Sequence, residues 1–180
     1  MKIHLVTISM LLLAAVGAGA GRFGRATSTN TDEMRAVNAP EQSSAKNFDA
    51  SADAALLAMK KHATELKIGG VAVVAYFEGD TLQAWSSKML VVGRMKDAPS
   101  TGNNGSNLLG IAYAKAAEMA DTLQNSGSGT RPPMIGEFGW QGGVIARAKT
   151  GYVIAAFSGG KSEDDVETSK AGLEVLKSAL

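Results

Sequence analysis

Residues 141–176 read QGGVIARAKTGYVIAAFSGGKSEDDVETSKAGLEVL, and strand, turn and helix signals follow one another in this stretch. Val144 to Lys149 alternates apolar residues with polar or small ones, which is typical of a half-buried strand. Thr150-Gly151 is a plausible two-residue turn, and Tyr152 to Phe157 is a continuous apolar run. The pattern predicts a β-hairpin whose second strand is buried.

A helix signal follows the hairpin. Ser158-Gly159-Gly160 breaks the strand, and Ser162 is the predicted N-cap, with Asp165 three residues further on. The acidic residues of this first turn are stabilised by the positive end of the helix dipole. Because they would repel a phosphate, we interpret the glycine turn as a turn and cap and not as a phosphate-binding loop. Apolar side chains at helical spacing form one face, which we expect to pack on the sheet: Val166, Leu173, Leu176 and Leu180.

Upstream, the sequence predicts a helix, three strand-like segments, a polar loop and a second helix. Their expected bounds are a helix from Asp49 or Ser51 to Lys67, a central strand over Val71–Phe77, a returning strand over Thr81–Trp85, a segment ambiguous between strand and loop over Met89–Met95, an exposed loop over Asp97–Asn107, and a helix over Asn107–Leu123. This order predicts an α/β (α+β) fold with a five-stranded antiparallel sheet flanked by helices.

The N-terminus has the pattern of a secretory signal peptide. A charged start at Lys2 precedes an apolar run from Leu5 to Val16 and small residues up to Ala20. A membrane anchor is the competing interpretation, but this run is shorter than the roughly 20 apolar residues that a span needs. We therefore expect a signal peptide over 1–20, a flexible leader over 21–46, one domain over 47–180, and a periplasmic or secreted location.

Composition excludes several classes of function. The chain has no cysteine, so disulfides, thiolate catalysis and cysteine-based zinc sites are excluded. Removal of Lys2 with the signal peptide leaves 17 basic residues against 17 acidic ones. This balance argues against a nucleic-acid partner or a broad anionic-membrane surface.

Three stretches resemble the GlcG/HbpS family, the haem-degrading or PduO C-terminal-like domain. They are the C-terminal hairpin with its Ser-Gly-Gly turn and helix, Val92–Ala98 with its Arg-Met pair, and Ile111–Ala116 with its Lys-Ala pair. The resemblance covers roughly residues 48 to 180. It implies a profilin-like fold, a homo-oligomer and haem or another tetrapyrrole as ligand. The family's aspartate-containing turn after the first strand is replaced here by Tyr76-Phe-Glu-Gly79, which argues against activity that needs that aspartate.

Four residues are candidates for a haem site. His62 is the only histidine after signal removal, and the resemblance implies that a histidine on this helix is the axial iron ligand. Met59 lies one turn from His62 and would line the same wall, while Tyr113 offers a phenolate ligand. Arg94 has the geometry to bind a haem propionate.

Each candidate also has a purely structural interpretation. His62 would be a half-buried residue at a helix edge, and Met59 and Tyr113 would fill the core or an interface. Arg94 would form a salt bridge with Asp97 at a strand end. For Trp85 and Trp140, sheet packing or a subunit contact stands beside stacking on a porphyrin.

The resemblance leads us to expect an exported haem-binding protein for sequestration, storage or sensing of haem, and the enzymatic activity that it implies is slow haem degradation. A sensor partner and a homo-oligomer go with this expectation. The alternative is an extracellular small-metabolite sensing or interaction module without haem, because a shared fold does not settle function. No pair of carboxylates has a sequence context that indicates a hydrolase.

Overall fold

The computed structural model describes residues 39–180, and side chains from residue 47 onward. The predicted signal peptide and residues 21–38 of the predicted leader lie outside this range. The described chain forms three helices, a four-stranded antiparallel sheet and a two-stranded one. Within it, no helix combines the length and apolar character of a membrane span.

The main sheet has the strand order β2-β1-β6-β5 and is antiparallel throughout. Its strands are β1 (Gly70–Glu78), β2 (Ser86–Val92), β5 (Gly143–Arg147) and β6 (Gly151–Ser158). The predicted central strand and C-terminal hairpin are therefore confirmed. The hairpin turn is centred one residue earlier than expected, on Lys149-Thr150, and is closed by a bond from Ala148 N to Gly151 O.

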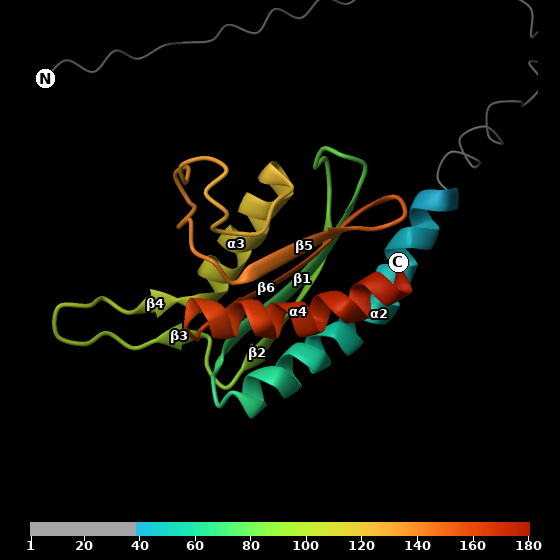
Figure 1. Ribbon diagram of the computed structural model, residues 1–180. Coiled ribbons are helices and arrows are strands. Elements are labelled where there is room, and N and C mark those ends of the chain that lie inside the picture. Colours follow the sequence, from blue (N-terminus) through green and yellow to red (C-terminus); the bar gives the residue numbers. More distant parts are fainter. Residues whose placement is uncertain (1–38) are drawn as a thin grey trace, which may run out of the picture.

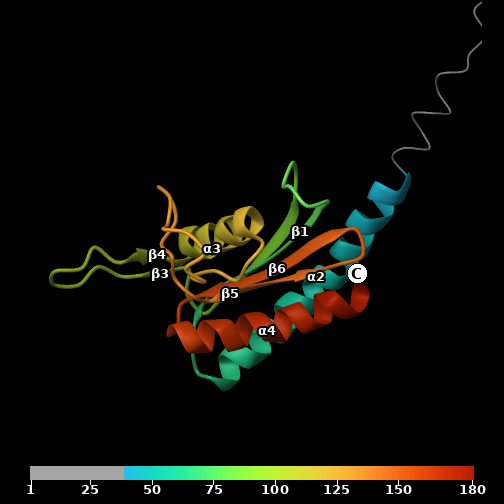
Figure 2. The ribbon, with the colours of Figure 1, turned by 45° about the horizontal axis from the view of Figure 1, so that its top comes forward.

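Helices cover both faces of the sheet (Figures 1 and 2). On one face lie α2 (Ala39–Glu65) and α4 (Ser162–Ala179), which also pack against each other, and on the other lies α3 (Leu108–Thr122). Side chains of β1 alternate between two cores, with Ala72 and Val74 facing α2 and α4, and Val73 and Phe77 facing α3. This alternation explains why the central strands read as continuous apolar runs.

A thin arm projects from the body beyond the end of the main sheet (Figure 1). It consists of β3 (Lys96–Asp97), β4 (Ser106–Asn107) and the polar loop between them. The expected exposed loop over Asp97–Asn107 is thus largely confirmed, with one short ladder at its base. Asn107 also caps α3, because its side chain accepts a hydrogen bond from Gly110 N.

The five-stranded sheet is wrong, because Thr81–Trp85 is not a strand. The partner of β1 begins at Ser86, and the register pairs Val71 with Val91 and Val73 with Met89. This pairing places the apolar run Met89–Val91 opposite Val71–Val73, so apolar side chains meet across the two strands. The segment that was ambiguous between strand and loop therefore supplies most of β2.

The first helix begins earlier than predicted. It starts at Ala39 rather than Asp49 or Ser51, so residues 39–46, assigned to the flexible leader, form its first turns. Pro40 falls in the first turn, where a missing N–H is tolerated. The helix ends at Glu65, two residues before the predicted Lys67.

Candidate functional site

A buried ion pair joins α3 to α4 at the end of the sheet that carries the arm. Lys115 Nζ lies 2.9 Å from Asp165 Oδ2, and their side chains are only 4% and 5% exposed. Lys115 also donates to Phe157 O at 2.8 Å, and Asp165 Oδ1 accepts from Gly160 N at 2.8 Å. The third N–H of Lys115 has no acceptor in the described part of the chain.

Burial pushes both members of this pair toward their neutral forms. It lowers the pKa of the Lys115 ammonium, and the charge of Asp165 together with the hydrogen bond to it only partly opposes this shift. Burial likewise raises the pKa of the Asp165 carboxyl, against the effects of Lys115 and the Gly160 amide. Perturbed charges of this kind are typical of functional sites, although structural ion pairs produce them too.

The ion pair lies at the wall of a pocket of about 160 Å³. The pocket is bounded by the base of the arm, the first turns of α3, the Trp140-Gln141 segment and the turn between β6 and α4. Its polar side chains combine donors and acceptors: Asp97, Ser106, Lys115, Gln141, Ser158, Ser162 and Asp165. It can therefore hold a small molecule by hydrogen bonds.

The N-terminus of α4 opens on the same pocket. The N-cap is Lys161 rather than the predicted Ser162, and it makes no side-chain hydrogen bond to the helix. Asp165 does not close a capping box with Ser162; its side chain is turned to Gly160 N and Lys115 instead. Ser162 is the first helical residue and lines the pocket, so backbone donors of an uncapped first turn lie at its wall.

Gly159 has a backbone that suits only glycine at this turn. Its φ is +149°, and a β-carbon there would collide with Gly69 O. The close approach of these two chain segments holds the turn at the edge of the pocket.

Arg94 lies beside the pocket and ties together two residues that line it, Asp97 and Gly159. Its Nε donates to Asp97 Oδ1 at 2.7 Å, and its Nη2 donates to Gly159 O at 2.6 Å. The predicted alternative, a salt bridge to Asp97, is confirmed. Arg94 thus links the arm to the glycine turn.

The other predicted site residues lie elsewhere. Met59 is fully buried in the core beside α4, where a β-carbon added to Gly172 would lie 2.6 Å from its Sδ. His62 is about one third exposed near the end of α2, with Nδ1 3.8 Å from Glu65 Oε2. The two residues do not share a pocket wall.

Tyr113 belongs to α3, on the opposite face of the sheet from Met59 and His62. Its ring packs against Trp85 at a centroid distance of 6.2 Å, which confirms the packing interpretation for that pair. The four predicted haem contacts are therefore not brought into one pocket. Among the residues that the structure describes, no three His, Asp or Glu side chains are placed to hold a metal ion either.

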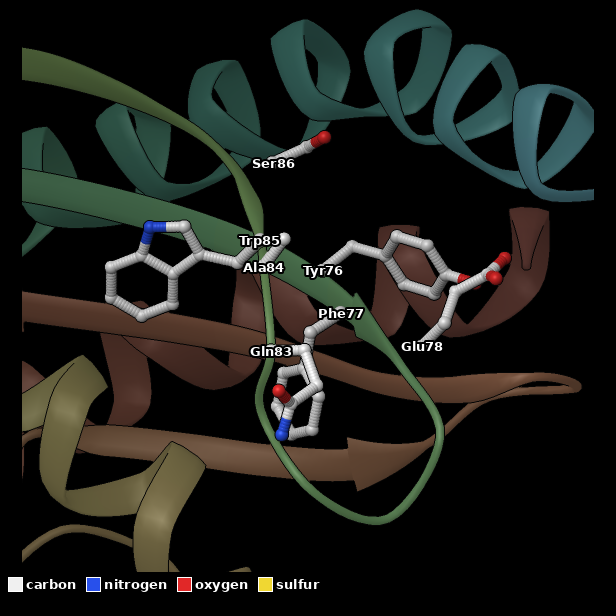
Figure 3. Close-up of a pocket in the computed structure, with 7 residues that line it drawn as sticks. All are labelled: Tyr76, Phe77, Glu78, Gln83, Ala84, Trp85 and Ser86. Carbon is white, nitrogen blue, oxygen red and sulfur yellow. The ribbon is translucent and has the colours of Figure 1, made fainter. Parts of the chain in front are cut away.

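A second cavity, of about 200 Å³, lies where β1 ends and the chain curls back toward β2 (Figure 3). Tyr76 and Glu78 lie on one side of it, and Trp85 and Gln83 lie on the other. Tyr76 Oη is 2.9 Å from Glu78 Oε1 and 2.6 Å from Thr150 Oγ1. The cavity contains no buried charged pair, so the pocket at Lys115 is the stronger candidate.

The sequence analysis missed Lys115 and Asp165 as site residues. A signal was present for Lys115, because it lies four residues after Ile111 and four before Met119, both on the buried face of α3. A charge on an apolar stripe requires a buried partner. Asp165 gave no such signal, because an acidic residue in the first turn of a helix already has a sufficient structural role.

No family model matches the chain, and no match was found among curated proteins. The likeness to the GlcG/HbpS family therefore stays a prediction.

Proposed function

We propose that the protein is a binding module for a small organic molecule that carries a carboxylate, held in the pocket beside Lys115. The observation that carries this proposal is a buried ammonium with one unused N–H at the wall of a pocket of matching polarity. A buried donor without a partner is costly, and a ligand oxygen would satisfy it. We assign no catalytic residue.

The chemistry of the lining supports a carboxylate. Lys115 and the uncapped first turn of α4 supply donors, and the acidic Glu163 and Asp164 of that turn are not among the residues that line the pocket. The two lining aspartates are already paired, Asp165 with Lys115 and Asp97 with Arg94. A charge-assisted hydrogen bond to a carboxylate is stronger than one between neutral groups. The pocket, at about 160 Å³, is well below the roughly 300–1,000 Å³ of sites for drug-sized ligands, so the ligand has only a few heavy atoms.

We also propose that the protein is related to the GlcG/HbpS family and shares its profilin-like fold. All three family-like stretches contribute to this one pocket: Val92–Ala98 supplies Asp97, Ile111–Ala116 supplies Lys115, and the C-terminal stretch supplies the turn before α4. Stretches that are separate in the sequence but meet at one pocket are expected if the family-like residues form one binding site. With the predicted signal peptide, this gives an exported metabolite-binding or sensing module.

Thermal unfolding with added ligand tests the proposal. Acetate and succinate are the probes, and glycerol is the neutral comparison. A ligand that binds only the folded state raises Tm by mass action, so both acids are expected to raise Tm in a saturable way.

Ser162→Leu, which fills the pocket mouth, should abolish this rise. Ser178→Leu is the matched control, because it makes the same change on an exposed part of the same helix. If neither acid stabilises the protein, or if both variants respond like the wild type, the proposal fails.

Haem remains a second candidate, supported by exposed aromatic rings at the pocket rim. Trp140 is 51% exposed and stacks on Phe138 with their centroids 4.8 Å apart. A porphyrin is too large for the pocket, so it would lie outside on these rings with a propionate beside Lys115. His62 does not fit this arrangement, because it lies on neither the rim nor the wall.

Haem titration followed by visible absorption separates these alternatives. If this second candidate holds, a saturable Soret shift should persist in His62→Ala and disappear in Trp140→Ala. A shift that is lost in His62→Ala would instead restore the histidine ligand predicted from sequence. No saturable shift would remove haem and leave the small carboxylate.

A further inference from the structure

A short loop presents an unusual amount of apolar surface. Between α3 and β5, four large apolar residues fall within seven positions, and all are exposed. Ile135 is fully exposed, and the other three are about half exposed: Met134, Phe138 and Trp140. We call residues 131–140 the apolar loop.

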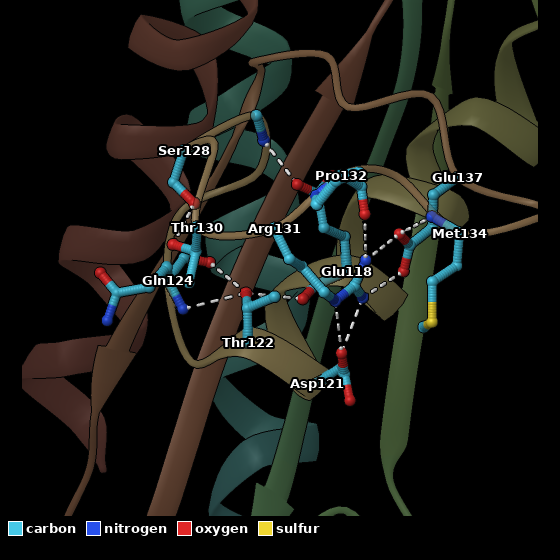
Figure 4. A network of polar contacts seen from close by, with 11 residues as sticks. Glu118, Asp121, Thr122, Gln124, Ser128, Thr130, Arg131, Pro132, Met134 and Glu137 are labelled. Carbon is cyan, nitrogen blue, oxygen red and sulfur yellow. Dashed lines mark hydrogen bonds and ion pairs between the residues drawn. The ribbon is translucent and has the colours of Figure 1, made fainter.

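The loop is held in one conformation by an internal ion-pair network (Figure 4). Arg131 donates to both carboxylate oxygens of Glu137, at 2.7 and 2.8 Å, and also to Asp121 on α3. The Glu137 side chain is only 8% exposed, and it accepts a further bond from Met134 N at 2.9 Å. Pro133 packs so closely on Gly139 that a β-carbon there would clash.

Such a network makes the loop a preorganised binding surface. A loop that is ordered before association loses little entropy when a partner docks on it. Together the four side chains expose on the order of 500 Å² within seven positions, an area comparable with the largest apolar patch on a typical monomer, which often has a function. A standard interface takes about 800 Å² from each partner, so the loop alone would supply more than half of one side.

We propose that the apolar loop is the contact through which two copies of this chain associate. In a two-fold dimer the same patch of both copies meets itself, so it must be self-complementary. An apolar patch meets this condition, whereas a patch with charges of one sign would repel its copy. The charges within the loop are already paired internally, since Arg131 faces both Glu137 and Asp121. Exposed aromatic and methionine side chains with few free charges are the composition of interface centres.

The same features make a lipid surface a weaker choice. Attachment to anionic membranes normally uses free basic side chains around the apolar group. The only cation within the loop is Arg131, which is occupied by two carboxylates. Trp140 belongs to both the loop and the ligand pocket, so a second copy docked here would lie at the pocket mouth.

Sedimentation equilibrium of the purified protein over a concentration series tests the proposal. The wild type is expected to form a dimer. Ile135→Asp places a charge at the most exposed position without affecting the monomer core, and it should raise the dimer dissociation constant by about 30-fold or more.

Leu57→Asp is the matched control, because Leu57 is an exposed leucine on α2, away from the loop, and its replacement should leave association unchanged. Arg131→Lys keeps the charge but loses the two-pronged contact, so it should weaken the dimer less than Ile135→Asp. A wild type that stays monomeric, or a dimer that Ile135→Asp does not weaken, overturns the proposal. Monomeric protein that binds phosphatidylcholine vesicles through Ile135 would also overturn it and assign the loop to a membrane.

Discussion

Replacing Lys115 by methionine is expected to destabilise the fold by about 3–5 kcal/mol, the typical cost of removing one partner of a buried ion pair. Three features place this pair in that class. Both side chains are at most 5% exposed, the ions are 2.9 Å apart, and each makes a further hydrogen bond to the backbone. For a chain of this size the loss corresponds to about 6–20 °C in Tm.

The assay is a double-mutant cycle by urea unfolding, with Lys115→Met, Asp165→Asn and the double variant. Asparagine keeps the oxygen that accepts from Gly160, so the substitution chiefly removes the charge. If the two residues act as a pair, the double variant is more stable than the sum of the single losses predicts, by about 2–3 kcal/mol. Single effects that add to within about 0.5 kcal/mol would refute the reasoning.

A pH series gives a second readout of the same variants. In Lys115→Met the buried Asp165 has lost its counter-ion, so its pKa in the folded state lies above that in the unfolded chain. The folded state then binds the proton more tightly, so the free energy of unfolding rises as pH falls through this raised pKa and levels off below the pKa of the unfolded chain. The double variant lacks this group and should show no such rise.

Three further outcomes are expected. Gly172→Ala should cost about 1–3 kcal/mol in thermal unfolding, because the added methyl group meets the buried Met59. Hydrogen bonds from Arg131 and then from the Met134 amide lower the pKa of Glu137 from 4.5 to about 2. The stability that this carboxylate gives the apolar loop is therefore present above pH 4.5 and is lost as pH falls toward 2. The NMR signal of the Trp140 indole should report this loss, and Glu137→Gln should abolish the pH dependence. His62→Ala should change stability by less than about 0.5 kcal/mol, because the side chain is partly exposed and makes only a weak contact.

The fold was predictable where burial leaves a local pattern. Strand β1 and the C-terminal hairpin are apolar runs bounded by glycine turns, and α3 follows a capping asparagine. The pairing partner of β1 was not predictable locally, because Thr81–Trp85 and Ser86–Val92 both resemble strands. Register settled the choice, and register depends on which apolar residues meet across the sheet.

The start of α2 left no apolar pattern to read. Residues 39–46 are mainly small or polar, and their helical backbone bonds do not appear as a periodicity in the sequence.

The site was less predictable than the fold because its residues meet only in three dimensions. Lys115 and Asp165 are 50 positions apart and belong to helices on opposite faces of the sheet. His62 was predicted as the iron ligand because it is the only histidine after signal removal. The structure places it near two carboxylates, those of Glu65 and Glu167. Negative charge of this kind opposes the binding of a haem that carries two propionates.

The most direct test of the proposed pocket is an NMR titration of ¹⁵N-labelled protein with succinate. The account predicts saturable shifts centred on the amides of Gly159, Gly160 and Ser162, which vanish in Ser162→Leu and persist in Ser178→Leu. They should also weaken as pH rises through the lowered pKa of Lys115, because the ammonium loses its charge. Shifts centred on His62, or no saturable shift at these three amides, would contradict a ligand site beside Lys115.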